Sequence, residues 1–235
     1  MKGNIRKVSV AVGLITLSCI TASGQGIELH RVFGTALFPK AERPAWTITA
    51  ETAGIVRWGL LRARVYLHAG NKGVEAAYGE FVQEWRTGVG GFAVQTEYNG
   101  GLHNGKAYGE ALLIGPAYRW DSQDFSRSFA IAGLYRYLPG NTAMHGYQLA
   151  CTWEYIFGNG LFSFRGFAKA WRETLDIGGY HGWAEPQIWL NLGALPVSFL
   201  HETNLSLGGE ASVRYTLGAP STFHAIPSAA IRFTF

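Results

Sequence analysis

Charged side chains recur at alternate positions along the chain, and their chemistry is the first clue to what the protein does. Glu80 and Glu84 stand four residues apart, and Arg165 and Lys169 stand four apart with Phe167 between them. Residues separated by two or four positions share one face of a β-strand. Carboxylates that face arginine and lysine can pair with one another or bind the polar groups of a small solute.

These alternating charges predict the lining of a barrel lumen in which acids and bases are nearly balanced. Arginine is favoured over lysine, as expected where water is limited and bidentate pairs with carboxylates form. Lumenal aromatic rings could stack on a planar solute, or the charges could simply pair and fill the barrel. The candidate lumenal and solute-contacting residues are Glu80, Glu84, Glu97, Glu110, Arg136, Glu154, Arg165, Phe167, Lys169, Trp171, Trp183, Glu185, Trp189, Glu210 and Arg214.

The histidines show no spacing that is typical of a catalytic site. His30 shares a strand face with Glu28, whereas His103, His145 and His181 fall in connections expected at the outer end of the barrel. Clustering of these three could form a metal site, although their spacing does not require one. We expect no enzyme activity, no catalytic residues, no metal and no cofactor.

The final segment, residues 223–235, shows most clearly which element positions these side chains. Its odd-numbered positions run from Phe223 to Phe235 and are apolar, while Ser228 and Arg232 lie on the other parity. At roughly 3.3 Å per residue the segment spans about 43 Å, so a tilt of about 40° lets it cross a bilayer. It is typical of the closing strand of a bacterial outer-membrane barrel, with the apolar face toward lipid and Ser228 and Arg232 toward the lumen.

Similar alternating segments, separated by turn residues such as Gly158-Asn159-Gly160, recur throughout the chain. They predict an all-β fold, a transmembrane antiparallel up-and-down β-barrel of about twelve strands. Arg119 lies off the parity of Glu110, which predicts a bulge at Gly115-Pro116. The expected strands are 26–33, 44–52, 60–69, 74–86, 89–98, 107–120, 127–138, 145–157, 161–172, 182–192, 203–217 and 222–235.

A soluble secreted β-protein would show the same alternation with its apolar face turned inward, so alternation alone does not separate the two. Large aromatic residues near strand ends, such as Tyr135 and Tyr137, favour the membrane because barrels carry aromatic girdles at both interfaces. After residue 24 the chain has no run of 18 apolar residues, so we expect no transmembrane helix.

Residues 1–24 have the pattern of a secretory signal peptide, which leaves residues 25–235 as the barrel. Lys2, Arg6 and Lys7 precede an apolar run from Val8 to Ile20 that is too short to span a membrane. Small residues follow, so cleavage is expected just before Gln25. The alternative of a lipoprotein anchored at residue 19 lacks the aliphatic residue that its motif needs three positions earlier.

The charge of the chain argues against a nucleic-acid partner. The signal peptide carries three basic residues and no acid, so its removal lowers the formal charge from +4 to +1 (4 − 3 = 1). The basic character therefore belongs mainly to the signal, not to a cluster on the exported protein. Cys151 is then the single remaining cysteine, so no intrachain disulfide can form.

Several motifs along the exported chain carry a resemblance to a known family. They are Asn71-Lys72-Gly73-Val74, Glu97-Tyr98-Asn99-Gly100-Gly101-Leu102, Leu113-Ile114-Gly115-Pro116-Ala117-Tyr118, Asp124-Phe125-Ser126-Arg127, the block from Gly146 to Trp171, Glu185-Pro186-Gln187-Ile188-Trp189-Leu190-Asn191-Leu192, and Ile226-Pro227 to Phe235. Their order resembles a family of Gram-negative outer-membrane proteins that are similar to the nucleoside-specific Tsx channel.

This resemblance implies a twelve-stranded barrel with periplasmic termini, whose terminal aromatic residue is read by the barrel-assembly machinery. We therefore expect a cell outer-membrane protein in contact with outer-membrane lipid. The leading hypothesis is a channel for passive diffusion of small solutes, and the Tsx likeness suggests nucleoside-like ones. The alternative is a closed structural or partner-binding barrel with a charge-filled lumen, and a barrel enzyme acting on lipid is a third hypothesis.

Overall fold

The computed structural model describes residues 24–34, 44–70, 73–103, 106–139, 144–172, 179–197, 200, 203–217 and 222–235. The predicted signal peptide lies outside these residues except for Gly24, which begins the first strand. Most residues of the connections expected at the outer end of the barrel also lie outside them. Within the described part, no helix is long and apolar enough to cross a membrane.

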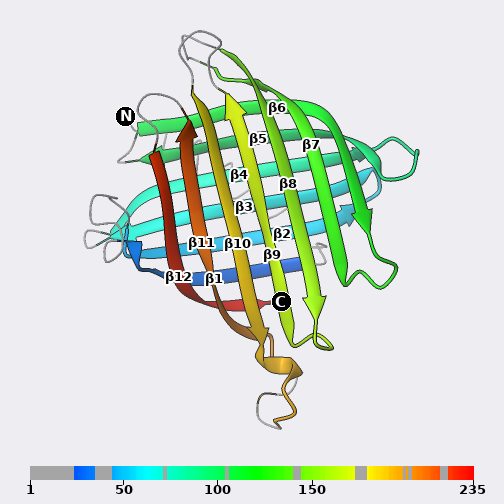
Figure 1. Ribbon diagram of the computed structural model, residues 1–235, viewed down its shortest axis with the longest axis vertical. Helices are drawn as coiled ribbons and strands as arrows, with labels where there is room; N and C mark the ends of the chain where they lie inside the picture. Colours follow the sequence, from blue (N-terminus) through cyan, green and yellow to red (C-terminus); the bar gives the residue numbers. More distant parts are fainter. Residues whose placement is uncertain are drawn as a thin grey trace.

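Twelve antiparallel strands form a closed barrel in which each strand pairs with its sequence neighbours and β1 pairs with β12 (Figure 1). The predicted fold class is therefore confirmed. The strands are β1 (Gly24–Val32), β2 (Trp46–Val56), β3 (Gly59–Gly70), β4 (Gly73–Arg86), β5 (Phe92–His103), β6 (Lys106–Asp121), β7 (Arg127–Tyr137), β8 (His145–Phe157), β9 (Phe162–Arg172), β10 (Tyr180–Asn191), β11 (Leu205–Leu217) and β12 (Thr222–Thr234).

Tight turns join the strands at the end of the barrel that carries Gly24 and Phe235. Between β8 and β9, Asn159 and Gly160 have φ angles of 56° and 87°, the left-handed values that the two central residues of a tight hairpin turn require, and Leu161 donates its backbone N–H to Gly158 at 3.1 Å. A short 3-10 helix, η1 (Leu192–Ala194), follows β10 at the same end. Phe235 donates its backbone N–H to Gln25 across the closure between β12 and β1, at 3.1 Å.

Burial along the strands shows that the apolar residues face outward. On β12, Phe223 and Ile231 are 64% and 49% exposed, and Phe235 directly after it is 60% exposed, whereas Ser228 is 9% exposed. A soluble protein would bury these side chains, because exposed apolar surface is costly in water. The barrel instead places apolar groups toward lipid and polar groups toward the lumen, as in transmembrane barrels.

The bulge in β6 lies at a different position from the predicted one. The pairing of β5 with β6 shifts between Asn99 and Gly101, opposite Gly109, whose φ is +67°. The ladder passes through Gly115 and Pro116 without a shift. A glycine takes the bulged, positive-φ position without the strain that a side chain would add.

The absence of a shift at Gly115-Pro116 corrects the expectation that Glu110 lines the lumen. Glu110 is exposed and shares the parity of Leu112 and Ile114, which are 49% and 51% exposed on the outer face. Arg119 lies on the other parity and points inward, where it contacts Glu84. The two residues therefore occupy opposite faces of β6.

Candidate functional site

A cavity of about 900 Å³ occupies part of the lumen and forms the candidate functional site. Its lining includes Gly90 and Phe125, which belong to turns at the end of the barrel that carries the termini. It extends from there to Arg165, Phe167 and Lys169 in the middle of β9. A cavity of this size can hold one small organic molecule.

Basic and acidic side chains contribute equally to the lining of this lumenal cavity. The basic ones are Arg62, Arg64, Arg86, Arg119, Arg165 and Lys169, and the acidic ones are Glu51, Glu80, Glu84, Glu97, Asp121 and Glu154. With six of each sign, the lining has no formal net charge. It is therefore unsuited to selecting ions of one sign by its summed charge alone.

A first group of ion pairs lies toward the turns. Glu84, on β4, accepts hydrogen bonds from Arg119 at 2.8 and 2.7 Å and from Arg62 at 3.2 Å. The Arg119 contact is bidentate, the strongest arrangement for a guanidinium and a carboxylate. These bonds join β3, β4 and β6 along one side of the barrel.

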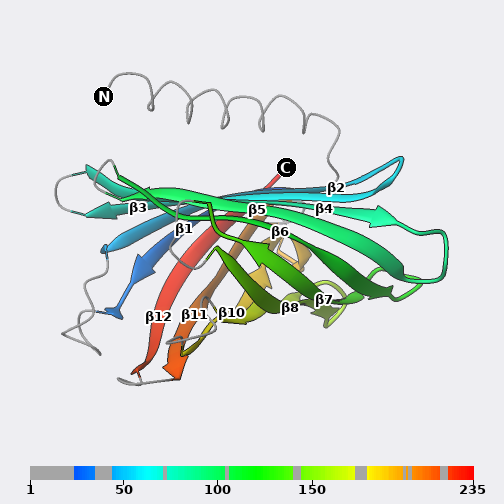
Figure 2. The same ribbon diagram turned by 90° about the horizontal axis from the view of Figure 1, so that it is seen from above.

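A second group crosses the lumen from β9 to the opposite wall. Lys169 donates to Glu80 on β4 at 2.7 Å and to Glu97 on β5 at 2.9 Å, and Arg165 donates to Glu51 on β2. In Figure 2, β3, β4 and β5 form one side of the barrel and β8, β10 and β11 the other. The contacts of β9 with β2, β4 and β5 therefore bridge the lumen at its middle.

Aromatic rings pack beyond these bridges. Tyr66, Phe167 and Trp183 form a buried aromatic cluster in which Phe167 and Trp183 are 4.9 Å apart at their ring centroids. Tyr66 also donates its hydroxyl to Glu185 across the barrel, at 3.1 Å. Phe167 lines the cavity while Tyr66 and Trp183 do not. The aromatic cluster therefore bounds the inner end of the cavity.

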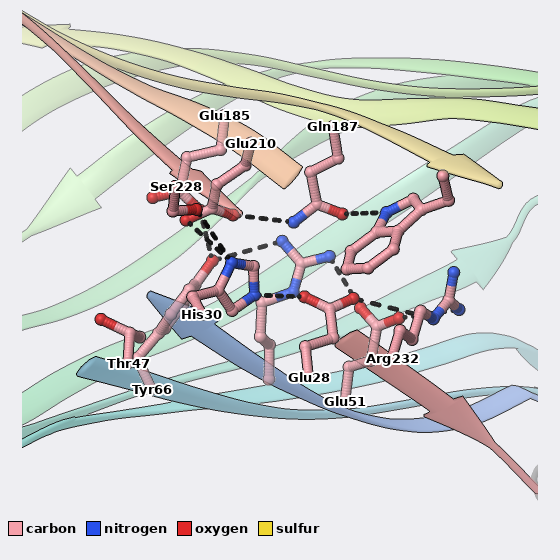
Figure 3. A network of polar contacts seen from close by, with 12 residues as sticks. Glu28, His30, Thr47, Glu51, Tyr66, Glu185, Gln187, Glu210, Ser228 and Arg232 are labelled. Atoms are coloured by element: carbon pink, nitrogen blue, oxygen red, sulfur yellow. Dashed lines mark hydrogen bonds and ion pairs between the residues drawn. The ribbon is translucent and has the colours of Figure 1, made fainter. Parts of the chain in front are cut away.

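A third polar group lies at the closure between β1 and β12 (Figure 3). His30 is 0% exposed, with Nε2 3.0 Å from Glu28 Oε2 and Nδ1 3.1 Å from Ser228 Oγ. Glu210 lies 3.7 Å from the same Nδ1. A hydroxyl, an imidazole and a carboxylate in this order resemble the parts of a nucleophilic site. None of the three lines the cavity, so a substrate in it would not touch Ser228.

The structure places the other predicted site residues on inward-facing positions. Glu80, Glu84, Glu97, Glu154, Arg165, Phe167 and Lys169 line the cavity. Trp189 is 1% exposed, with its indole Nε1 bonded to Gln187, and Glu210 accepts a bond from the same glutamine. Arg136 lies over Trp171 at 5.1 Å and Arg214 over Trp183 at 4.8 Å.

Several lumenal groups were absent from the predicted set. Glu51, Arg62, Arg64 and Arg119 line the cavity, and His30 joins the closure of the barrel. Their parity along β1, β2, β3 and β6 is that of inward-facing residues. Strand parity shows that a side chain points inward, but it does not show which wall the side chain meets across the lumen. The predicted site therefore omits these residues.

The predicted outer histidines do not come together. His145 bonds to Tyr135, which is 39% exposed, whereas His181 stacks on Trp171 at 5.8 Å. His103 lies at the end of β5 and is exposed. In the described ranges, no group of three or more His, Cys, Asp or Glu side chains could hold a metal ion.

The fold and the charged lumen together define a transmembrane β-barrel of the outer-membrane type. Residues 24–235 match the family described as "Domain of unknown function (DUF5020)", and the chain belongs to this family. No curated protein matches the chain.

Solved structures of similar fold include a porin. The "KdgM porin" is 10% identical, with a TM-score of 0.50 over 90% of this chain and 99% of that chain. The "KdgM porin in complex with disordered oligogalacturonate" is 8% identical, with a TM-score of 0.49 over the same shares of the two chains. Acinetobacter baumannii OccAB3 is 11% identical, with a TM-score of 0.42 over 89% of this chain and 59% of that chain. At these identities the similarity shows the fold alone.

Proposed function

We propose that the protein is an outer-membrane channel through which small solutes diffuse passively. The observation that carries this proposal is the cavity of about 900 Å³, lined by charged side chains, inside a transmembrane barrel. A lumen built only to stabilise the barrel would be filled by its side chains, because empty space inside a protein lowers stability. The open, charged space is instead suited to a small polar solute.

We also propose that the protein lies in the outer membrane and that the barrel-assembly machinery is its assembly partner. The exposed aromatic side chains of Phe233 and Phe235, 48% and 60% exposed, lie on the lipid face beside the closure with β1. They support insertion into the outer membrane with the help of the barrel-assembly machinery. The end that carries Gly24 and Phe235 would then face the periplasm, and so would the open part of the cavity.

Passage through the barrel requires the cross-lumen contacts to separate. Lys169 with Glu80, and Tyr66 with Glu185, join opposite walls between the cavity and the far end of the lumen. A solute that replaces these bonds with its own could pass at a modest free-energy cost, because it satisfies the groups that it separates. This favours small polar solutes moving one at a time and disfavours bulk flow of large molecules.

A more specific proposal is that the solutes are nucleoside-like. Binding of a nucleoside would need an aromatic face on which its base can stack. Phe167 is the member of the aromatic cluster that lines the cavity. Arg64 and Lys169 lie over its ring at 5.4 and 5.6 Å, and Trp183 packs against it edge to face. The ring is therefore already contacted by side chains, so binding through charged groups is better supported than base stacking.

A closed structural barrel is the second candidate, and the bridge from Lys169 to two carboxylates favours it. Such a network can fill a lumen and fix the barrel shape without any transport. The arrangement of His30, Glu28 and Ser228 does not favour an enzyme, because none of these residues lines the cavity. We therefore propose no enzymatic activity.

Liposome swelling separates the channel from the closed barrel. Purified protein in liposomes should admit small sugars, amino acids and nucleosides at rates that fall with solute size. Glu185→Ala removes the acceptor of the Tyr66 and Trp183 bonds and should raise the rates modestly in a channel. If only Glu185→Ala liposomes swell, and wild-type ones do not, the closed barrel is correct.

A further inference from the structure

The two walls of the lumenal cavity differ in chemistry. On β7 and β8, Ala130 pairs with Thr152 and Ala132 pairs with Ala150, and all four residues line the cavity. We call Ala130, Ala132 and Ala150 the alanine patch. Short side chains on adjacent strands leave open space in front of a continuous apolar surface.

The wall formed by β3, β4 and β9 is charged. Arg62 and Arg64 on β3 contribute to it, with Glu80 and Glu84 on β4 beside them and Arg165 and Lys169 on β9. The cavity therefore presents an apolar surface and a surface of both charge signs to the same molecule. A ligand that fits both must itself be amphipathic, with a compact apolar part and polar groups separated from it.

Two charged groups of the lining are accessible to a ligand in the cavity. Glu154 lies on the inward face of β8, four residues from Ala150, and no cation among the described residues comes within 4 Å of its carboxylate. Arg62 donates a hydrogen bond to Glu84 through Nη2, and its side chain remains 27% exposed. The Glu154 carboxylate and the exposed part of the Arg62 side chain can therefore each bind a charged group of a ligand.

We infer, on the basis of the proposed channel, that the cavity binds a zwitterionic solute with a compact apolar side chain, such as an apolar amino acid. The ammonium group binds Glu154 and the carboxylate binds Arg62. The apolar side chain lies against the alanine patch. Glu154 and Arg62 have opposite charge, and a zwitterion supplies one partner for each.

Charge balance explains why a zwitterion fits better than an ion. The cavity lining contains six acids and six bases, so a solute of net charge would leave one charge uncompensated away from bulk water. A neutral sugar would leave the alanine patch without an apolar partner. A zwitterion with an apolar side chain avoids both costs.

Binding is measured directly on folded, detergent-solubilised barrel by equilibrium dialysis with radiolabelled phenylalanine. We expect saturable binding that is competed by unlabelled phenylalanine and at least about tenfold more weakly by glycine, which lacks the apolar part. Phenylalaninamide and 3-phenylpropionate each lack one charge of the zwitterion, so they should also compete more weakly. Uridine and glucose should compete weakly as well. Equal competition by all six compounds would overturn the inference.

Two variants locate the site, and a matched one serves as control. Glu154→Gln removes the partner of the ammonium group without breaking an existing ion pair, so the dissociation constant should rise about tenfold or more. Ala132→Leu places a larger side chain in the alanine patch and should weaken phenylalanine binding more than glycine binding. Glu110→Gln changes a carboxylate on the outer face and should leave binding unchanged.

The outcome separates this inference from the channel proposal. Phenylalanine binding in a barrel that conducts no ions would contradict the channel proposal and support the binding site. Two results would support the channel proposal but contradict the binding site. One is ion conductance without saturable phenylalanine binding, and the other is ion conductance with equal phenylalanine binding by wild type and Glu154→Gln.

Discussion

Lys169 on β9 reaches across the lumen to Glu80 on β4, with its Nζ 2.7 Å from Glu80 Oε1. The same Nζ lies 2.9 Å from Glu97 Oε1 on β5. All three side chains are at most 9% exposed. A single ammonium group therefore pairs with two buried carboxylates and joins opposite walls of the barrel.

Removal of this ammonium group should destabilise the barrel strongly. Lys169→Met leaves Glu80 and Glu97 buried without their cation, a change that costs about 3–5 kcal/mol for buried pairs. The free energy of unfolding, measured by urea titration in phospholipid vesicles, should fall by this amount. Lys106→Met, at the exposed start of β6, is the control and should change it by less than about 0.5 kcal/mol. Equal stability of the two variants would contradict the bridging role.

Arg165 should control the ion selectivity of the lumen. Arg165→Ala removes a cation that lies on the cavity lining and donates to Glu51, which leaves excess negative charge in the lumen. In a channel, the reversal potential across a potassium chloride gradient should shift toward cation selectivity. The closed-barrel alternative instead predicts a lower thermal stability and conductance that only the variant shows.

His30 should stabilise the closure of the barrel between its first and last strands. Its ring nitrogens lie 3.0 Å from Glu28 Oε2 and 3.1 Å from Ser228 Oγ. His30→Phe keeps an aromatic ring but removes the hydrogen bonds to Glu28 Oε2 and Ser228 Oγ, at a cost of about 1–3 kcal/mol. The temperature at which the folded band is lost in detergent electrophoresis should fall. Ser228→Ala removes only one hydroxyl and should lower it less, and the reverse order would argue against this role.

Gly208 should be intolerant of any side chain, because Trp189 packs against it. A Cβ at Gly208 would lie 2.1 Å from Ile188 O and 2.7 Å from Trp189 Cε3. Gly208→Ala should therefore lower the free energy of unfolding by about 1–3 kcal/mol, the usual cost of overpacking. Gly133→Ala is the matched control on β7, since a Cβ there meets nothing within 4 Å. Equal loss in both variants would show that glycine flexibility matters, not the contact with Trp189.

Asp124 should remain ionised to unusually low pH in the turn between β6 and β7. Hydrogen bonds from the hydroxyls of Ser122 and Ser126 and from the Ser126 backbone N–H lower the pKa of Asp124 from 3.8 to about 2. Because the folded pKa is lowered, the associated stabilisation is complete above pH 3.8 and is lost as the pH falls through about 2. Carboxyl NMR titration should give this pKa, and alanine at both serines should return it toward 3.8. An unchanged pKa in that double variant would contradict the assigned cause.

The strands could be predicted from the sequence because the alternation of apolar and polar side chains that identifies a strand is a local property of the chain. The expected strand 145–157 coincides with β8 (His145–Phe157), and the expected 127–138 differs from β7 by one residue at its end. Alternation between two faces is a property of each strand alone. It is therefore sufficient to assign Arg165 and Lys169 to the inward face of β9.

The contacts across the lumen could not be predicted in the same way. Lys169 and Glu80 are 89 residues apart, and His30 and Ser228 are 198 apart. Parity places each side chain inside the barrel, but its partner depends on strand tilt and register around the whole circumference. Glu110 shows the other limit, because the expected bulge at Gly115-Pro116 is absent and the strand alternates without interruption between Glu110 and Arg119.

The channel itself is tested most directly by recording ionic current from purified wild-type protein in planar lipid bilayers. The proposal predicts discrete unitary steps of small conductance, because the aromatic cluster and the bridges of Lys169 narrow the lumen. It also predicts that a permeating small solute reduces these steps reversibly. Folded barrel that inserts into the bilayer and shows no unitary conductance, together with no liposome swelling, would contradict it.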